Sequence, residues 1–176
     1  MRDEILRVLP EIGWIEDEGL REGVIRTYER ALREGGWNPK DMERIPFTLL
    51  KETGLSYADH VRAVTRIAHG VYETFSEIFG GRVPLKRDVL LAGALLHDVG
   101  KLLEITEQGG KFTKSAGGKV LRHPFSGVAL AYAEGLPPEV LHIIGTHSKE
   151  GDPHPRTPEG AVIHHADFTC FETVGG

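Results

Sequence analysis

The sequence predicts an all-α protein. Apolar residues recur at helical spacing over most of its 176 residues, whereas runs that alternate apolar and polar residues, as strands do, are nearly absent. Glycine pairs and prolines interrupt these segments at places where helices would end or begin. A chain of this length buries roughly 70% of the surface that it exposes when unfolded. We therefore expect a single domain over residues 1–176.

The N-terminal section, residues 1–54, is predicted to be helical. Helices are expected over residues 2–10 and 15–34, because apolar residues recur at i, i+4 steps and Gly35-Gly36 stops the second helix. A short helix is expected after Asn38-Pro39. No linker composition separates this section from the rest of the chain.

A striped helix and a uniformly apolar helix follow. The first is expected over residues 56–79, with Ser56 as its N-cap and Gly80-Gly81 as its stop. The second, over residues 86–99, is apolar on nearly all sides, as expected of a central buried helix. The stripe of the first helix consists of Val61, Val64, Ile67, Ala68, Val71, Tyr72, Phe75 and Ile78.

The second half of the chain is predicted to contain a hairpin and three more helices. Gly109-Gly110 lies at the centre of a short hairpin within residues 102–115. Prolines and end signals then predict helices over residues 118–134, 137–147 and 157–171, with a proline-rich surface loop over residues 148–160.

Composition limits the classes of function. The net charge of -5 is spread along the chain without a basic block, so binding to duplex nucleic acid is not expected. No segment resembles a signal peptide or reaches the ~20 apolar residues of a membrane span. The single cysteine, Cys170, fits a reducing compartment. We therefore expect a cytoplasmic protein that does not enter the membrane.

Six polar residues lie at the borders of apolar helical stripes, at five places in the sequence. These places are separated by 37, 26, 24 and 20 residues, about one helical hairpin each, so a helical bundle would bring them to one point. Each histidine alone fits a hydrogen-bonded core residue, but the joint pattern indicates a metal site. The residues are His60, His97, Asp98, His123, His147 and Asp167.

Metal binding would supply partners for these buried polar groups, which are costly when unpaired. Imidazole and carboxylate ligands without a thiolate point to iron, manganese, cobalt, zinc, nickel or magnesium. Six protein ligands exceed what one catalytic ion takes while it keeps a position for water, so we expect two divalent ions bridged by one carboxylate.

The motifs around these residues resemble the HD-domain superfamily of metal-dependent phosphohydrolases. The segments YADHVRAVTRIAH, LLHDVGK and IHHADF place His60, His97-Asp98 and Asp167 in the order H…HD…D, and the resemblance covers residues 55–171. RHPFSGVAL and IIGTHSKEGD resemble the additional histidines of binuclear HD proteins, including the HD-GYP phosphodiesterases. The GYP signature is missing, and Thr146-His147 stands where that group has two adjacent histidines.

The resemblance implies an HD-domain helical bundle with an N-terminal helical extension over residues 1–54 and an HD core over 55–171. It implies that the first ion is held by His60, His97, Asp98 and Asp167, and the second by Asp98, His123 and His147. Asp98 would then bridge the two ions.

The activity implied is hydrolysis of a phosphoester in a nucleotide or another small phosphorylated metabolite, with metal-activated water as the nucleophile. Asp98 and Lys101 are the candidate catalytic residues. Lys101, Arg122 and Lys149 are candidate phosphate contacts, although Lys101 also fits a cation that stabilises a helix C-terminus. His164 shares a helix face with Asp167 and is a candidate substrate or supporting residue.

Two other functions remain open from the sequence. The same residues suit a di-iron oxygenase on an HD-like fold, or a regulatory module that metal ions only stabilise. Substrate specificity is expected from residues 102–120 and 148–157, with Trp14 and Trp37 as further candidates, and the oligomeric state is not predicted.

Overall fold

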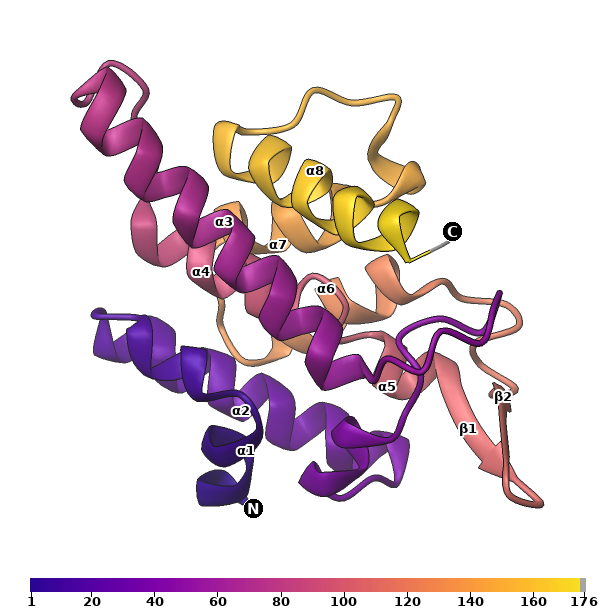
Figure 1. Cartoon of the computed structure of the whole chain (residues 1–176). Helices are drawn as coiled ribbons and strands as arrows, with labels where there is room; N and C mark the ends of the chain where they lie inside the picture. Colours follow the sequence, from indigo (N-terminus) through magenta and orange to yellow (C-terminus); the bar gives the residue numbers. More distant parts are fainter. Residues whose placement is uncertain (175–176) are drawn as a thin grey trace.

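The computed structural model describes residues 1–174 and confirms the all-α fold. One short hairpin, strands β1 and β2, projects from the helical body (Figure 1). The elements in chain order are α1 (Arg2–Val8), η1 (Pro10–Trp14), α2 (Glu18–Gly35), η2 (Pro39–Glu43), α3 (Tyr57–Phe79), α4 (Arg87–Leu96), α5 (Lys101–Glu104), β1 (Ile105–Gln108), β2 (Lys111–Lys114), α6 (His123–Ala133), α7 (Pro138–Thr146), η3 (Lys149–Gly151) and α8 (Pro158–Thr173), where η marks a 3-10 helix.

Helix α4 is the centre of the bundle. Every residue from Leu90 to Leu96 is buried, as the continuous apolar run predicts. It packs against α3, α7 and α8 from the later part of the chain and against α2 and η1 from the N-terminal section. Because α4 is enclosed on all sides, the turn that follows it lies deep inside the molecule.

The N-terminal section shares its core with the rest of the chain. Tyr28 and Leu32 of α2 belong to the same buried cluster as Leu95 of α4 and Ile144 of α7. The Tyr28 hydroxyl also donates a hydrogen bond to the Leu95 carbonyl. These contacts join the extension to the core, while the expectation of a single domain stays a prediction.

The predicted element boundaries are wrong by three residues or more in three places. The helix expected from residue 118 begins at His123, because Pro124 has no N–H for an i→i−4 bond and a turn over residues 116–120 precedes it. The helix expected from residue 15 begins at Glu18, after Asp17 accepts a hydrogen bond from the Leu20 N–H.

The third difference lies at the end of α4, which stops at Leu96 where a helix to residue 99 was expected. The chain tightens there into i→i+3 turns, in which the N–H of Val99 donates to the Leu96 carbonyl and that of Lys101 to the Asp98 carbonyl.

Two residues of the predicted stripe of α3, Ile67 and Ile78, are exposed, since that helix projects beyond its neighbours (Figure 1).

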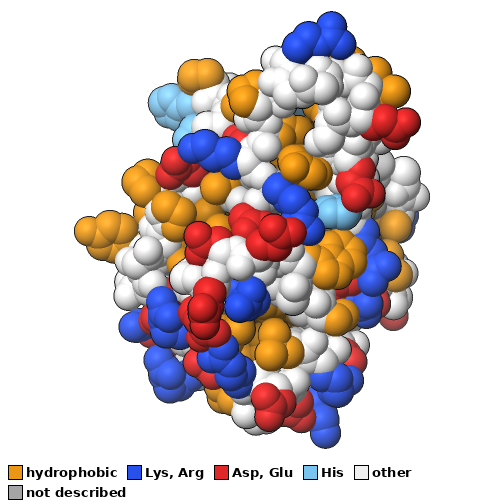
Figure 2. Space-filling view, turned by 90° about the vertical axis from the view of Figure 1, so that its left-hand side faces the viewer, with side chains coloured by type: hydrophobic (Ala, Val, Ile, Leu, Met, Phe, Trp, Pro, Cys, Tyr) orange, Lys and Arg blue, Asp and Glu red, His pale blue; other side chains and the backbone are white. Residues whose placement is uncertain are grey.

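Within residues 1–174, no helix is both long and apolar enough to cross a membrane. On the face of the molecule shown in Figure 2, lysine and arginine side chains are interspersed with aspartate and glutamate. This face carries no continuous basic surface.

Candidate metal centre

The bundle brings all six predicted polar residues together in its interior. His60 lies in the first turn of α3, His97 and Asp98 in the turn after α4, and Asp167 in α8. His123 is the first residue of α6, and His147 caps the C-terminus of α7. Five of these side chains are buried in the protein, and Asp167 is partly exposed. Four helix ends and the middle of α8 therefore meet at one point.

The ligand atoms of these residues form two clusters. In the first cluster, His60, His97 and Asp167, the potential ligand atoms all lie within 4.8 Å of one another, and the same holds for the second cluster, Asp98, His123 and His147. These residues could hold divalent metal ions. That they do so stays a prediction.

The carboxylate of Asp98 lies between the two clusters. Its Oδ2 is 3.3 Å from His60 Nε2 and 3.5 Å from His97 Nε2. Its Oδ1 is 3.2 Å from His123 Nε2 and 3.6 Å from His147 Nε2. One oxygen thus faces each cluster, which is the arrangement that a bridging carboxylate requires.

Hydrogen bonds fix three of the imidazoles in one tautomer. His97 Nδ1 donates to the Ala94 carbonyl at 2.6 Å, and His147 Nδ1 donates to the Ile144 carbonyl at 2.8 Å. His123 Nδ1 donates to Glu104 Oε2 at 2.9 Å. Because Nδ1 carries the hydrogen in each ring, the neutral ring directs the lone pair of Nε2 into the clusters.

These lone pairs face each other without a proton between them. His123 Nε2 and His147 Nε2 are 3.3 Å apart, and neither carries a hydrogen in this tautomer, so they cannot bond to each other. Asp98 Oδ2 pairs with the Lys101 ammonium at 2.6 Å but accepts no hydrogen bond of good geometry from the described residues. A cation between the side chains would satisfy these atoms, so the donor set fits divalent metal ions.

The protonation states also suit metal binding, which needs neutral imidazoles and ionised carboxylates. Burial lowers the pKa of His97 to about 4 and lowers the pKa of His123. Burial alone would raise the pKa of both aspartates, but their partners outweigh it. Lys101 and His97 hold the pKa of Asp98 well below its usual range, and the hydrogen bond with His60 lowers that of Asp167 to about 2.

His60 is the exception. Burial would lower its pKa, but the adjacent carboxylates of Asp167 and Asp98 outweigh burial and raise the pKa of His60. A cation bound to these carboxylates would remove the cause of this rise.

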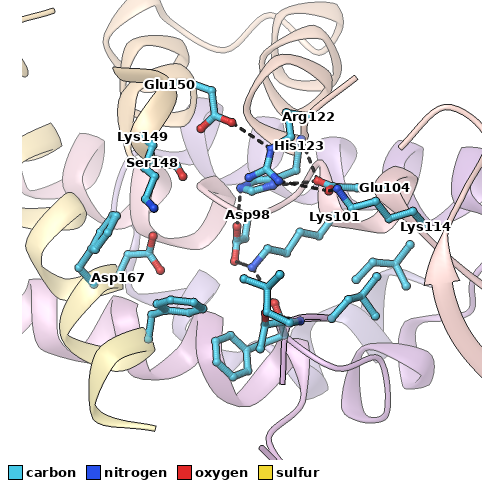
Figure 3. Close-up of a pocket in the computed structure, with 17 residues that line it drawn as sticks. Asp98, Lys101, Glu104, Lys114, Arg122, His123, Ser148, Lys149, Glu150 and Asp167 are labelled. Atoms are coloured by element: carbon cyan, nitrogen blue, oxygen red, sulfur yellow. Dashed lines mark hydrogen bonds and ion pairs between the residues drawn. The ribbon is translucent and has the colours of Figure 1, made fainter. Parts of the chain in front are cut away.

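The centre opens into a cavity of about 420 Å³. Asp98, His123 and Asp167 line its floor (Figure 3). Four carboxylates line the cavity, those of Asp98, Glu104, Glu150 and Asp167, together with four cationic side chains. Three of the cations pair with these carboxylates, and the fourth can meet an anionic group. These cations are Lys101, Lys114, Arg122 and Lys149.

The four cationic side chains differ in whether a carboxylate already pairs with them. Lys101 Nζ lies 2.6 Å from Asp98 Oδ2 and donates to the Phe47 carbonyl at 2.7 Å. Arg122 pairs with Glu150 at 2.9 Å. Lys149 forms no ion pair with any described residue, and its ammonium group points into the cavity (Figure 3).

His164 does not line this cavity. Its Nδ1 donates to the backbone carbonyl of His147 at 2.6 Å. The structure thus places it behind a member of the second cluster, where it supports the position of His147, and its predicted contact with substrate has no support here.

Sequence reasoning missed Glu104 and Phe47. Glu104 Oε2 accepts hydrogen bonds from the backbone N–H and the Nδ1–H of His123, and Glu104 Oε1 pairs with Lys114 at 3.0 Å. Burial alone would raise the pKa of Glu104, but the hydrogen bond from His123 and the contact with Lys114 outweigh burial and lower it to about 2. The only signal for Glu104 in the sequence was a charged residue directly after the apolar pair Leu102-Leu103.

The two tryptophans considered for specificity lie outside the residues that line the cavity. Trp37 is buried and donates its Nε1–H to the Leu102 carbonyl at 2.9 Å. Trp14 packs against His69, with ring centroids 5.1 Å apart. The tryptophans therefore hold the N-terminal section in place.

Comparison with known proteins assigns the fold and the motif to one family. Residues 57–169 match the HD domain, and the chain belongs to this family, as the H…HD…D pattern predicts. A dihydroneopterin 2',3'-cyclic phosphate phosphodiesterase from Methanocaldococcus jannaschii is 33% identical over 111 residues. This match covers 62% of the chain but 43% of the relative, so the chain spans less than half of that protein. No solved structure matches the chain significantly.

Proposed function

We propose that the protein is a metal-dependent hydrolase that cleaves a phosphoester bond in a small phosphorylated metabolite such as a nucleotide. Two divalent ions would be bound, one by each cluster, with Asp98 shared between them. The phosphodiesterase activity named for the relative supports this reaction class. Which substrate is cleaved does not follow from a match that covers less than half of that relative.

The observation that carries the proposal is the position of Asp98 in a cavity that also receives the ammonium group of Lys149, which has no ion-pair partner among the described residues. The two oxygens of Asp98 face different clusters, and the cavity above it is lined by lysine and arginine side chains. A bridging carboxylate beside an anion-binding cavity suits the displacement of an oxygen from phosphorus.

Bound ions would lower the pKa of a water molecule and neutralise charge on the phosphoryl oxygens. The side chains of the protein perform the remaining tasks. Lys149, which lacks an ion-pair partner among the described residues, binds a phosphoryl oxygen, and Arg122 offers the N–H groups that Glu150 leaves free. Lys101 keeps Asp98 ionised and has one N–H left for the oxygen of the leaving group.

The cavity favours an enzyme over a module that metal ions only stabilise. In such a module the clusters would be sealed from solvent, whereas Asp98, His123 and Asp167 line an open cavity. No observation on the structure favours an oxygenase over a hydrolase, so the experiment includes that outcome.

The test is a substrate screen on protein loaded with manganese, iron, cobalt, nickel, zinc or magnesium. Phosphomonoesters, linear phosphodiesters and cyclic phosphodiesters are assayed with and without oxygen. We expect oxygen-independent hydrolysis that Lys149→Ala weakens mainly through a higher KM, while Lys119→Ala, which changes a lysine outside the cavity, has little effect. Turnover only with oxygen, or none on any phosphoester, would overturn the proposal.

A further inference from the structure

One side of the cavity is apolar. It consists of residues from the segment before α3 and from the C-terminal half of α8. We name these residues the apolar wall, and they are Phe47, Leu49, Leu50, Phe168 and Phe171.

Most of the apolar wall lies outside the family match. Residues 47–50 precede the matched range 57–169, and Phe171 follows it. The N-terminal extension thus supplies three of the five residues of the wall, Phe47, Leu49 and Leu50. The two clusters lie within the matched range, so the extension adds apolar surface beside a centre that the core provides.

The wall is anchored directly to the metal centre. The ring of Phe47 stacks on the ring of His60, with centroids 4.8 Å apart, and it meets Phe171 edge to face at 6.3 Å. The Phe47 carbonyl accepts the hydrogen bond from Lys101. Phe171 lies four residues after Asp167 in α8, so both side chains project from one helix face. These contacts fix the distance between the wall and the clusters.

The wall also contains apolar surface that the fold itself does not cover. Leu50 is 84% exposed and Leu49 is 37% exposed, although both line the cavity. Phe168 and Phe171 are partly buried, and a ligand would cover more of their surface. A flat aromatic group gains both from this burial and from offset or edge-to-face contact with phenylalanine rings.

We propose that the apolar wall is a subsite for a planar aromatic ring on the substrate, joined to the phosphoester that the clusters and Lys149 receive. The phosphate half of this ligand rests on the proposed function, whereas the ring half rests on the wall alone. A cavity of about 420 Å³ is of the size that small-molecule sites occupy. The N-terminal extension then has a role in recognition through residues 47–50.

The experiment measures equilibrium binding to the manganese-loaded full chain by calorimetry. Two ligand pairs carry the same phosphate with and without a ring: adenosine 5'-phosphate against ribose 5-phosphate, and phenyl phosphate against methyl phosphate. In at least one pair we expect the ring to tighten binding about tenfold or more, as stacking on an aromatic side chain does. Phe171→Ala and Leu50→Ala should each reduce this ratio, while binding of ribose 5-phosphate and inorganic phosphate changes less than about twofold.

Phe79→Ala is the matched control, because this phenylalanine is 36% exposed at the end of α3 and does not line the cavity. Leu50→Ala is the second variant because Leu50 is 84% exposed, so its truncation should leave the fold intact. Ratios near one for both pairs in the unaltered protein, or variants that weaken ring-bearing and ring-free ligands equally, would overturn the subsite. A protein that binds rings through Phe171 but hydrolyses no phosphoester would retain the subsite and lose the proposed function.

Discussion

At the scale of single residues, the centre depends on which atom of each side chain already forms a hydrogen bond within the protein. Backbone carbonyls hold Nδ1 of His97 and His147, and Glu104 holds Nδ1 of His123. Asp98 keeps both oxygens directed at imidazole nitrogens. The chain thus presents donor atoms that have few other partners, and single substitutions should act on metal binding before they act on the fold.

Asp98→Asn tests whether one carboxylate serves both clusters. The amide keeps the size of the side chain but loses the charge and one acceptor oxygen, so we expect bound metal to fall below one ion per chain and hydrolysis to fall at least about a hundredfold. Elemental analysis after dialysis measures the first effect. Asp152→Asn, whose side chain is 58% exposed, is the control. Full metal content in Asp98→Asn would refute the bridging role.

Glu104→Gln tests the support of the second cluster. The substitution removes the charge that attracts His123 Nδ1–H, and loss of such a partner costs about 10-fold to 100-fold in metal affinity. We expect the second ion to bind that much more weakly while the first is unaffected. Competition with a fluorescent chelator measures both constants. Glu107→Gln, at an exposed position of strand β1, should change neither constant, and equal weakening of both ions would contradict the assignment.

At the scale of elements, the sequence predicts what local patterns determine. Stripes, caps and glycine stops locate α2, α3 and α8 to within a few residues, and the Gly109-Gly110 pair locates the hairpin. Positions that depend on distant contacts were missed. Phe47 reaches the centre because of a loop between α2 and α3, and Glu104 becomes important only when α5 lies beside α6. No periodic pattern in the sequence predicts either of these positions.

Gly100 shows how closely two elements must approach to build the centre. A Cβ atom at this position would lie 2.0 Å from the His123 carbonyl oxygen and 2.8 Å from the Gly127 nitrogen. Glycine therefore lets the turn that carries Asp98 touch the first turn of α6. Close packing of this turn against α6 thus explains why the LLHDVGK motif has glycine at this position.

We expect Gly100→Ala to lower the free energy of unfolding by about 1–3 kcal/mol, as overpacking does, and to weaken the second ion by moving His123. Urea denaturation measures the first effect. The control is Gly70→Ala, because Gly70 lies in α3 with no atom within 4 Å of an added Cβ. Alanine there should be neutral or stabilise the helix by up to about 1 kcal/mol. Equal stability of the two variants would contradict the close approach.

At the scale of the whole molecule, the N-terminal section and the HD core enclose the centre together. Residues from both parts form one buried cluster around α4, and both parts line the cavity. The extension is therefore more than a covering of the core, since it supplies both packing and a wall of the cavity.

We expect the two parts to unfold as one unit, in agreement with a single domain. Tryptophan fluorescence reports on the extension, because Trp14 and Trp37 both lie there, whereas far-ultraviolet circular dichroism reports mainly on the helices of the core. Coincident urea transitions by the two probes are expected. An earlier fluorescence transition would show that the extension unfolds separately.

The number of bound ions should determine how steeply the free energy of unfolding rises with metal concentration. An ion that binds only the folded state adds about 1.4 kcal/mol for each tenfold rise in its free concentration above its Kd. Two ions should therefore add roughly 2.7 kcal/mol per decade of free manganese, measured by urea denaturation in metal buffers. His123→Ala, which removes one member of the second cluster, should halve this slope, while His154→Ala at an exposed position should leave it unchanged. A slope of about 1.4 kcal/mol per decade in the unaltered protein would mean that one ion binds, and Asp98 would then have no second ion to bridge.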